Sequence, residues 1–212
     1  MVAGLNRSVA HSITDPKLGD RCKNIFGSAL TDYFKPAMRP REDQKVRCVT
    51  VGHNYRDYKA MRQVAEKLSG ERGIEFSVVS PRPTSMEGLP NVTVYKGIND
   101  EQLLHLYQQA DILFIPLTKA TANLALLEGI ACGLPVLSTS LPSVKAYLPG
   151  KEAILVGDND PQEFLDAILY LVKNPAVRLA MASAARKRAE ELDWRNIAPQ
   201  YEAIYSQLAQ GD

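Results

Sequence analysis

The sequence of 212 residues contains few of the residues that build metal centres or disulfide frameworks. Its three cysteines, Cys22, Cys48 and Cys132, have no paired spacing, and its three histidines stand apart from one another. Cys48 and Cys132 lie within apolar runs, which is typical of small buried side chains in a reducing compartment. The sequence therefore predicts neither a disulfide nor a metal site. No serine, cysteine or histidine stands in a nucleophile signature, so no catalytic residue is assigned.

An excess of charge and long apolar runs are also missing. The formal net charge of +1 argues against a general attraction to nucleic acid. The first residues, MVAGLNRSVAHSITD, lack the apolar core of a signal peptide, and no stretch approaches the length of a transmembrane helix. We therefore expect a cytoplasmic protein. The basic cluster at 186–188 leaves a contact with anionic lipid open, although the neighbouring Glu190 and Glu191 favour a solvated helix face.

Residues 1–45 differ from the rest of the chain. They are polar, contain three prolines and end in the charged run RPREDQK at 39–45. This composition indicates a leader and an interdomain-linker remnant. With 45% hydrophobic residues in the chain, residues 46–212 are long enough to form one well-buried domain.

From residue 46 onward, short apolar runs alternate with segments of helical periodicity. The predicted strands are 46–52, 75–80, 91–97, 111–117, 135–139 and 153–158. The predicted helices are 56–68, 99–110, about 122–132, one that begins after Asp160, 175–191 and about 194–208, where Pro199 would delay or kink the start. Asn99 with Gln102 predicts a capping box. This alternation predicts an α/β fold with a single Rossmann-like, doubly wound parallel sheet covered by helices on both faces.

The loop at 118–122 joins a fully apolar strand to a helix. In open α/β sheets, ligands bind beyond the carboxyl ends of the strands, where such loops lie. The free N–H groups from Asn123 to Ala125 and the helix dipole favour a phosphate at this point. The small residues Thr121 and Ala122 allow a ligand to approach the backbone closely.

Glu128 stands in the apolar run LALLEGIA at 124–131. An ionised carboxylate among apolar neighbours is costly unless it finds hydrogen-bond donors. Glu128 lies about one helical turn deeper than the free amides, where it is suited to accept two hydroxyls of a ribose. The alternative is a glutamate on the exposed stripe of an amphipathic helix, and this motif alone leaves both open.

The stretch Thr121–Thr139, TANLALLEGIACGLPVLST, closely resembles the signature of the large retaining glycosyltransferase family called group 1 or family 4. That signature is an acidic residue, a spacer, Glu, and then A-x-A-C-G-x-P-V. Val92–Pro116 is similar to the family's run G…D-E-x-L…Y…A-D-x-x-x-x-P, and Gly27–Pro36 is similar to its segment G-V-D-x-x-F-x-P. Because several such stretches occur in the right order, over about residues 27–208, chance is a poor explanation.

The resemblance carries expectations about architecture and ligand. Members of the family have two Rossmann-like lobes that face each other across a cleft, the GT-B architecture, and the C-terminal lobe binds the nucleotide-sugar donor. The resemblance therefore implies that residues 46–212 are this donor-binding lobe. It implies a UDP-, GDP- or ADP-sugar as substrate, transfer with retention at the anomeric carbon, and no cofactor.

The resemblance also implies roles for residues around the apolar helix and the first turn. Glu128 would bind the ribose hydroxyls, and the amides near Asn123 and Leu124 would hold the pyrophosphate. Ile98 occupies the position whose backbone contacts the base in the family. The family places an Arg and a Lys after the glycine turn that Gly52 begins here.

His53 replaces that Arg in this sequence, and Lys59 is displaced by one position. Arg56 and Lys59 remain as cations for a diphosphate. The alternative is that both only decorate the first turn of the following helix.

Two departures from the family pattern bear on activity. Ala120 replaces the first Glu of the paired motif, and residues 1–45 are too few to build an acceptor-binding lobe. We therefore expect an N-terminal lobe or a partner chain to complete the enzyme. The rival hypothesis is a non-catalytic module for nucleotide binding or protein interaction. The last helix would then carry its apolar residues partly exposed or packed on a partner: Trp194, Ile197, Tyr201, Ile204, Tyr205 and Leu208.

Overall fold

The computed structural model describes residues 2–3, 22–23, 26–38, 43, 45–120 and 123–209. Two short strands, β1 (Val2–Ala3) and β2 (Cys22–Lys23), form a parallel pair ahead of the main body. The main body is a six-stranded sheet. Its strands are β3 (Val46–Val51), β4 (Ile74–Val79), β5 (Val92–Tyr95), β6 (Ile112–Ile115), β7 (Val136–Thr139) and β8 (Ala153–Val156).

The six strands lie in the order β5-β4-β3-β6-β7-β8, and every neighbouring pair is parallel. The chain builds the sheet outward from β3 in one direction and then outward from β6 in the other. The boundary between β3 and β6 is therefore the topological switch point, where open α/β sheets bind ligands. The predicted doubly wound parallel sheet is confirmed.

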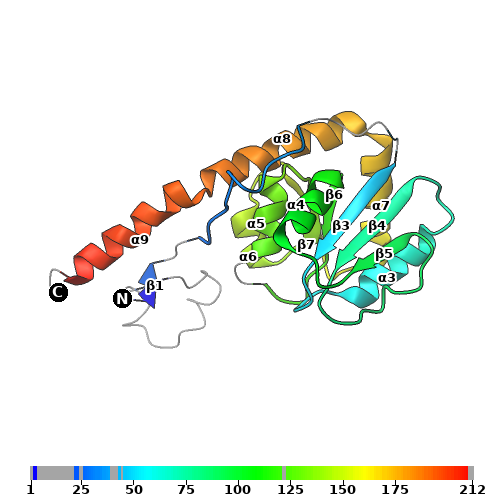
Figure 1. The fold of residues 1–212 in the computed structure, drawn as a ribbon, viewed down its shortest axis with the longest axis horizontal. Coiled ribbons are helices and arrows are strands. Elements are labelled where there is room, and N and C mark those ends of the chain that lie inside the picture. The colour runs from blue at the N-terminus through cyan, green and yellow to red at the C-terminus, as the bar shows by residue number, and fades with distance from the viewer. Residues whose placement is uncertain are drawn as a thin grey trace.

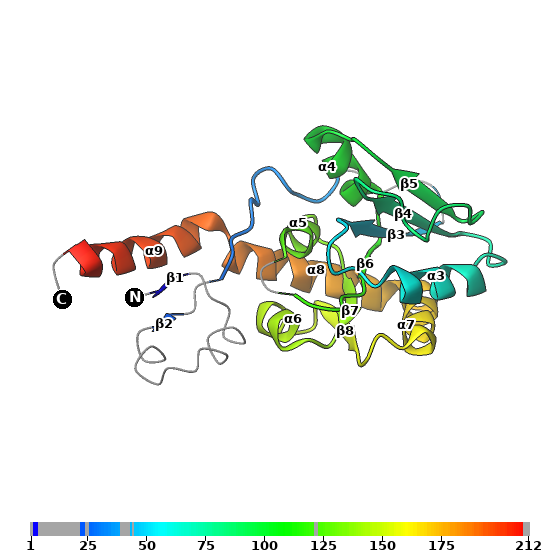
Figure 2. The ribbon, with the colours of Figure 1, turned by 90° about the horizontal axis from the view of Figure 1, so that it is seen from below.

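Helices cover both faces of the sheet (Figures 1 and 2). α3 (Tyr58–Lys67) and α7 (Pro161–Lys173) share a hydrophobic cluster with one face, and α4 (Asp100–Gln109) and α5 (Leu124–Ala131) share one with the other. α8 (Pro175–Glu191) packs along α5. β6 and β7 are buried along their whole length, because helices lie above and below them.

Local signals place most helix ends correctly. Asn99 and Gln102 form the predicted capping box of α4, and Asp160 caps α7 through the N–H of Gln162. Gly133 follows α5 with a φ of +73°, a conformation that glycine adopts without strain. One helix was not predicted, α6 (Pro142–Tyr147), which has no side-chain cap and is held by burial of Val144 and Tyr147.

Part of the predicted leader packs on the domain. Ala29 forms a parallel bridge with Asp193: its N–H donates to the carbonyl of Leu192, and its carbonyl accepts from the N–H of Trp194. The Ala29 side chain is buried. The guanidinium of Arg186 donates to the carbonyls of Thr31, Phe34 and Ala131, with Nη1–O distances of 3.3, 3.1 and 2.7 Å. Ala29 and Phe34 of the segment 26–38 therefore belong to the hydrophobic core of the sheet domain.

The last helix, α9 (Trp194–Ala209), extends away from the sheet domain (Figure 1). Pro199 lies inside α9, so it does not delay the start of the helix. Trp194 and Tyr205 are 47% and 63% exposed, whereas Ile197 and Ile204 are buried. The side chain of Leu208 lies outside the described residues. Within the described part of the chain, none of the helices combines the length and apolar character that crossing a bilayer requires.

Candidate functional site

A crevice of about 430 Å³ lies at the carboxyl edge of the sheet, beside the switch point. The loop after β3 forms one side and the start of α5 forms the other. The crevice is lined by Val51, Gly52, Asn54, Tyr55, Arg56, Leu103, Lys119, Ala120, Asn123, Leu124, Ala125 and Glu128. The structure thus brings together five of the predicted site residues, which are Gly52, Arg56, Asn123, Leu124 and Glu128.

The start of α5 offers to this crevice N–H donors that have no acceptor among the described residues. Asn123 is the N-cap, and its side-chain oxygen accepts from the N–H of Leu126. Within the described residues, nothing accepts a hydrogen bond from the N–H groups of Leu124 and Ala125. These N–H groups and the positive end of the helix dipole make the start of α5 suited to an anion.

Arg56 folds back beneath the loop that carries it. Its Nε and Nη2 donate to the carbonyl of Val51 at 3.0 and 2.7 Å, and its Nη1 donates to the carbonyl of Asn54 at 2.9 Å. Nη2 also reaches Oδ1 of Asn123 at 3.4 Å, which joins the loop to the start of α5.

The charge of Arg56 has no anionic partner in the described part of the chain. None of the described carboxylates lies within 4.0 Å of the guanidinium. Burial lowers the pKa of Arg56. Desolvation disfavours a buried cation unless an opposite charge compensates it. The crevice therefore contains a positive charge that an anionic ligand would neutralise.

Gly52 favours this arrangement. Its φ is +94°, and a Cβ at this position would lie 2.8 Å from Nη2 of Arg56. A side chain at residue 52 would therefore strain the backbone and displace the guanidinium.

Replacing Gly52 with alanine is expected to lower the free energy of unfolding by about 2–3 kcal/mol. Gly73→Ala is the matched control, because Gly73 has a similar φ of +96° and a Cβ added there would contact nothing within 4 Å. Strain alone predicts a loss of about 1–2 kcal/mol for the control. Urea unfolding measures both values. Equal losses in the two variants would contradict a role for the contact with Arg56.

The carboxylate of Glu128 lies deeper in the crevice and is half-buried. Its Oε2 accepts a hydrogen bond from the hydroxyl of Tyr107 at 2.8 Å. Burial raises the pKa of Glu128 above its ordinary value, the Tyr107 hydroxyl opposes this increase, and the charge of Asp100 adds to it. A carboxylate with one oxygen held and the other turned to a crevice can accept hydrogen bonds from ligand hydroxyls.

Three predicted residues do not line the crevice. Nδ1 of His53 lies 3.2 Å from Oγ of Ser80, while Lys59 is exposed on the first turn of α3. Ile98 lines a different cavity. Thr121 and Ala122 lie outside the described residues.

Sequence reasoning did not predict a role for Lys119 at the crevice or for Tyr107 beneath it. Lys119 is exposed at its rim, and the only signal for it was its place in the loop before α5. Tyr107 is fully buried beneath Glu128. In the sequence it cannot be distinguished from an ordinary aromatic residue on the buried face of a helix such as α4. Its contact with Glu128 depends on how α4 packs against α5.

Asn159 fixes the loops around this edge of the sheet. Its Nδ2 donates to Oδ2 of Asp57 at 3.0 Å and to the carbonyl of Leu117 at 3.1 Å. Its Oδ1 accepts from the hydroxyl of Thr139, and that hydroxyl oxygen accepts from the N–H of Leu117. The loops after β3, β6 and β8 and the end of β7 are therefore joined through one amide side chain.

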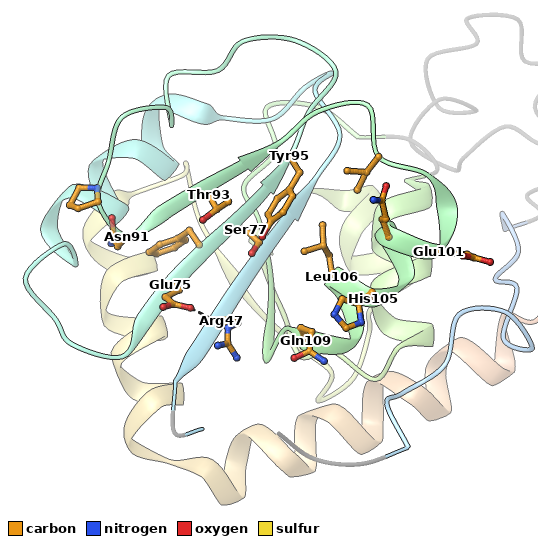
Figure 3. A pocket seen from close by; sticks show the side chains of 14 residues that line it. Arg47, Glu75, Ser77, Asn91, Thr93, Tyr95, Glu101, His105, Leu106 and Gln109 are labelled. Atoms are coloured by element: carbon orange, nitrogen blue, oxygen red, sulfur yellow. Dashed lines mark hydrogen bonds and ion pairs between the residues drawn. The ribbon is translucent and has the colours of Figure 1, made fainter. Parts of the chain in front are cut away.

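A second cavity of about 630 Å³ lies between α4 and the strands β3, β4 and β5 (Figure 3). Ser77, Thr93 and Tyr95 lie on its strand side, and His105 and Gln109 project from α4. Its charged pair, Arg47 and Glu75, is already joined at 3.2 Å. This cavity is larger than the crevice, but its only cation among the described lining residues, Arg47, already pairs with Glu75. The crevice lies beside the switch point and contains a guanidinium without an anionic partner among the described residues, so the crevice is the candidate site.

Known proteins are similar to this chain in sequence and in fold. A family profile described as "Glycosyl transferases group 1" matches residues 28–174. D-inositol 3-phosphate glycosyltransferase from Corynebacterium urealyticum is 31% identical over 151 residues, which are 71% of this chain and 31% of that protein. The chain thus spans about a third of the length of this curated relative.

Two solved structures share the fold. Sucrose-phosphate synthase from Thermosynechococcus elongatus superposes with a TM-score of 0.79 at 18% identity, over 100% of this chain and 59% of that chain. The C-terminal domain of a glycosyl transferase group 1 family protein from Francisella tularensis superposes with a TM-score of 0.66 at 17% identity. That match covers 77% of this chain and 97% of the domain.

Proposed function

Because the chain belongs to the group 1 glycosyl transferases, we propose that it is the lobe that binds a nucleoside-diphosphate sugar. The observation that carries this proposal is the pairing of two groups in one crevice. Arg56 supplies a positive charge without an anionic partner in the described residues, and Glu128 supplies a hydroxyl acceptor one turn below the free amides of α5. A diphosphate linked to a ribose carries the complementary groups in the same order.

In this proposal, the chain's own residues stabilise the leaving group. The N–H groups of Leu124 and Ala125 and the guanidinium of Arg56 would bind the diphosphate oxygens as negative charge develops on them. Glu128 would hold the ribose. The acceptor, and the remaining residues of the cleft, would come from an N-terminal lobe or a partner chain, with retention at the anomeric carbon.

One observation favours the rival function, a nucleotide-binding module without transferase activity. Ala120 lines the crevice where the family has a carboxylate for the donor sugar. A module without that carboxylate would bind the nucleoside diphosphate but gain little from the attached sugar. The affinities for UDP and UDP-glucose, or for the matching pair of another base, separate the two functions.

Isothermal titration of the full chain with UDP, GDP and ADP tests the proposal. We expect one of the three to bind with a stoichiometry of about one. The absence of binding heat for all three at millimolar ligand concentration, confirmed by an unchanged melting temperature, would overturn the proposal.

Glu128→Ala is expected to lower the affinity for the bound nucleoside diphosphate at least about tenfold, because hydrogen bonds to a charged group are lost. Glu101→Ala is the matched control, since Glu101 is an exposed glutamate on α4 outside the crevice. The control should keep the wild-type affinity. Equal affinities for both variants would argue against ribose binding by Glu128.

A further inference from the structure

The hydroxyl of Tyr107 connects two helices at the floor of the crevice. Tyr107 lies on α4 and is fully buried, and its hydroxyl reaches Oε2 of Glu128 on α5 at 2.8 Å. The carbonyl of Ala125 lies at 3.4 Å from the same hydroxyl. A phenol donates a single proton, and the charged oxygen is both the nearer and the stronger acceptor. The hydrogen bond therefore belongs to Glu128.

The ring of Tyr107 is held independently of that bond. Phe34 packs edge-on against it, with ring centroids 5.9 Å apart and an angle of 86° between the planes. Phe34 belongs to the segment 26–38, and Arg186 joins its carbonyl to the end of α5. The ring of Tyr107 is therefore held by packing as well as by its hydrogen bond to Glu128.

The two oxygens of Glu128 have different surroundings. Oε2 is occupied by Tyr107, while Oε1 has no hydrogen-bond partner among the described residues, and Glu128 lines the crevice. A flexible glutamate with both oxygens free would lose side-chain entropy when a ligand fixes it. Fixing one oxygen in advance removes much of that cost.

We propose that Tyr107 is a positioning residue, which holds Oε2 of Glu128 so that the carboxylate is presented to the ribose of the nucleotide. This inference rests on the proposed function. Tyr107 is buried beneath Glu128 and does not line the crevice, so it acts through the carboxylate.

A pH dependence distinguishes positioning from simple packing. The titratable groups near Glu128 include Tyr107 and Asp100 on α4 and Cys132 just after α5. Arg56 and Lys119 line the same crevice. Burial raises the pKa of Glu128, and the Tyr107 hydroxyl opposes the increase. Removing that hydroxyl raises the pKa further, so the ionised carboxylate is lost at a higher pH as the solution is acidified. Nucleotide affinity should fall with it.

The test uses Tyr107→Phe in the full chain, with the nucleoside diphosphate that binds best among UDP, GDP and ADP. Phenylalanine keeps the ring and its contact with Phe34. Affinity is expected to fall about fivefold at pH 8, and the decline toward acid pH should begin at a higher pH than in the wild type. Tyr147→Phe is the matched control, because Tyr147 is also buried and its hydroxyl accepts from the N–H of Gly27, away from the crevice.

The double variant Tyr107→Phe/Glu128→Ala completes the experiment. Without a carboxylate to hold, the loss of the hydroxyl should have no further effect on affinity, so the two changes should be non-additive. If Glu128→Ala lowers affinity but Tyr107→Phe matches Tyr147→Phe at every pH, the inference is overturned and the proposed function stands. If Glu128→Ala leaves affinity unchanged, the ribose contact of Glu128 and this inference are both overturned, whereas the titration of the wild-type chain decides nucleotide binding itself.

Discussion

Replacement of Arg56 by methionine is expected to lower the affinity for a nucleoside diphosphate about a hundredfold, which corresponds to about 2.7 kcal/mol. Methionine keeps the length of the side chain but removes the charge and every donor. The diphosphate would then lose the guanidinium that reaches the start of α5, while Lys119 at the rim of the crevice would remain. Isothermal titration at constant ionic strength measures the change, because phosphate contacts depend on salt.

Two further variants separate charge from loop geometry. Arg56→Lys keeps the charge but cannot donate to both Val51 and Asn54, so we expect an intermediate affinity. Arg62→Met is the matched control, since Arg62 lies on α3 and pairs with Glu66 outside the crevice. A folded Arg56→Met variant with wild-type affinity would exclude Arg56 as a phosphate ligand and leave it as a brace for the loop.

Arg186→Ala is expected to lower the free energy of unfolding by about 3 kcal/mol. The change removes the donors of three carbonyls, at Thr31, Phe34 and Ala131, that belong to the segment 26–38 and to α5. Carbonyls left without a donor in a packed region carry a desolvation cost. Urea unfolding with a probe of secondary structure measures the loss.

Lys187→Ala is the matched control for this prediction, because Lys187 is exposed on the same helix. It should change stability by no more than about 0.5 kcal/mol. Arg186→Lys should fall between the two, since one ammonium cannot reach three divergent carbonyls as a fork does. A loss no larger for Arg186→Ala than for Lys187→Ala would show that water replaces the guanidinium without cost.

The sheet was predictable because its signals are local. β6 reads as four consecutive apolar residues, ILFI, since helices cover both of its faces. The cap of α4 was predictable for the same reason, because Asn99 and Gln102 satisfy each other within one turn. α6 was missed because it is only six residues long and has no side-chain cap, although a proline stands at its start. Burial of Val144 and Tyr147 against the rest of the domain contributes to its stability.

The candidate site was predictable in its chemistry but not in its contacts. The apolar neighbours of Glu128 indicated a carboxylate with a special environment, and it is half-buried in the structure. Its partner Tyr107 lies 21 residues earlier in the chain, and no local pattern links the two. The sequence also left two roles open for Arg56. The guanidinium lies close to the backbone because Gly52 has no side chain. The sequence alone does not show that these two residues approach each other.

The packing of residues 26–38 changes how this protein should be divided in the laboratory. A chain cut at the charged run before β3 would lose the ring contact between Phe34 and Tyr107. It would also lose two carbonyls that accept hydrogen bonds from Arg186. Such a truncation would remove part of the hydrophobic core and not merely a linker. A shortened version of this protein should therefore keep everything from residue 26 onward. If a shorter version failed to bind nucleotide, the loss of core packing would be enough to explain the failure.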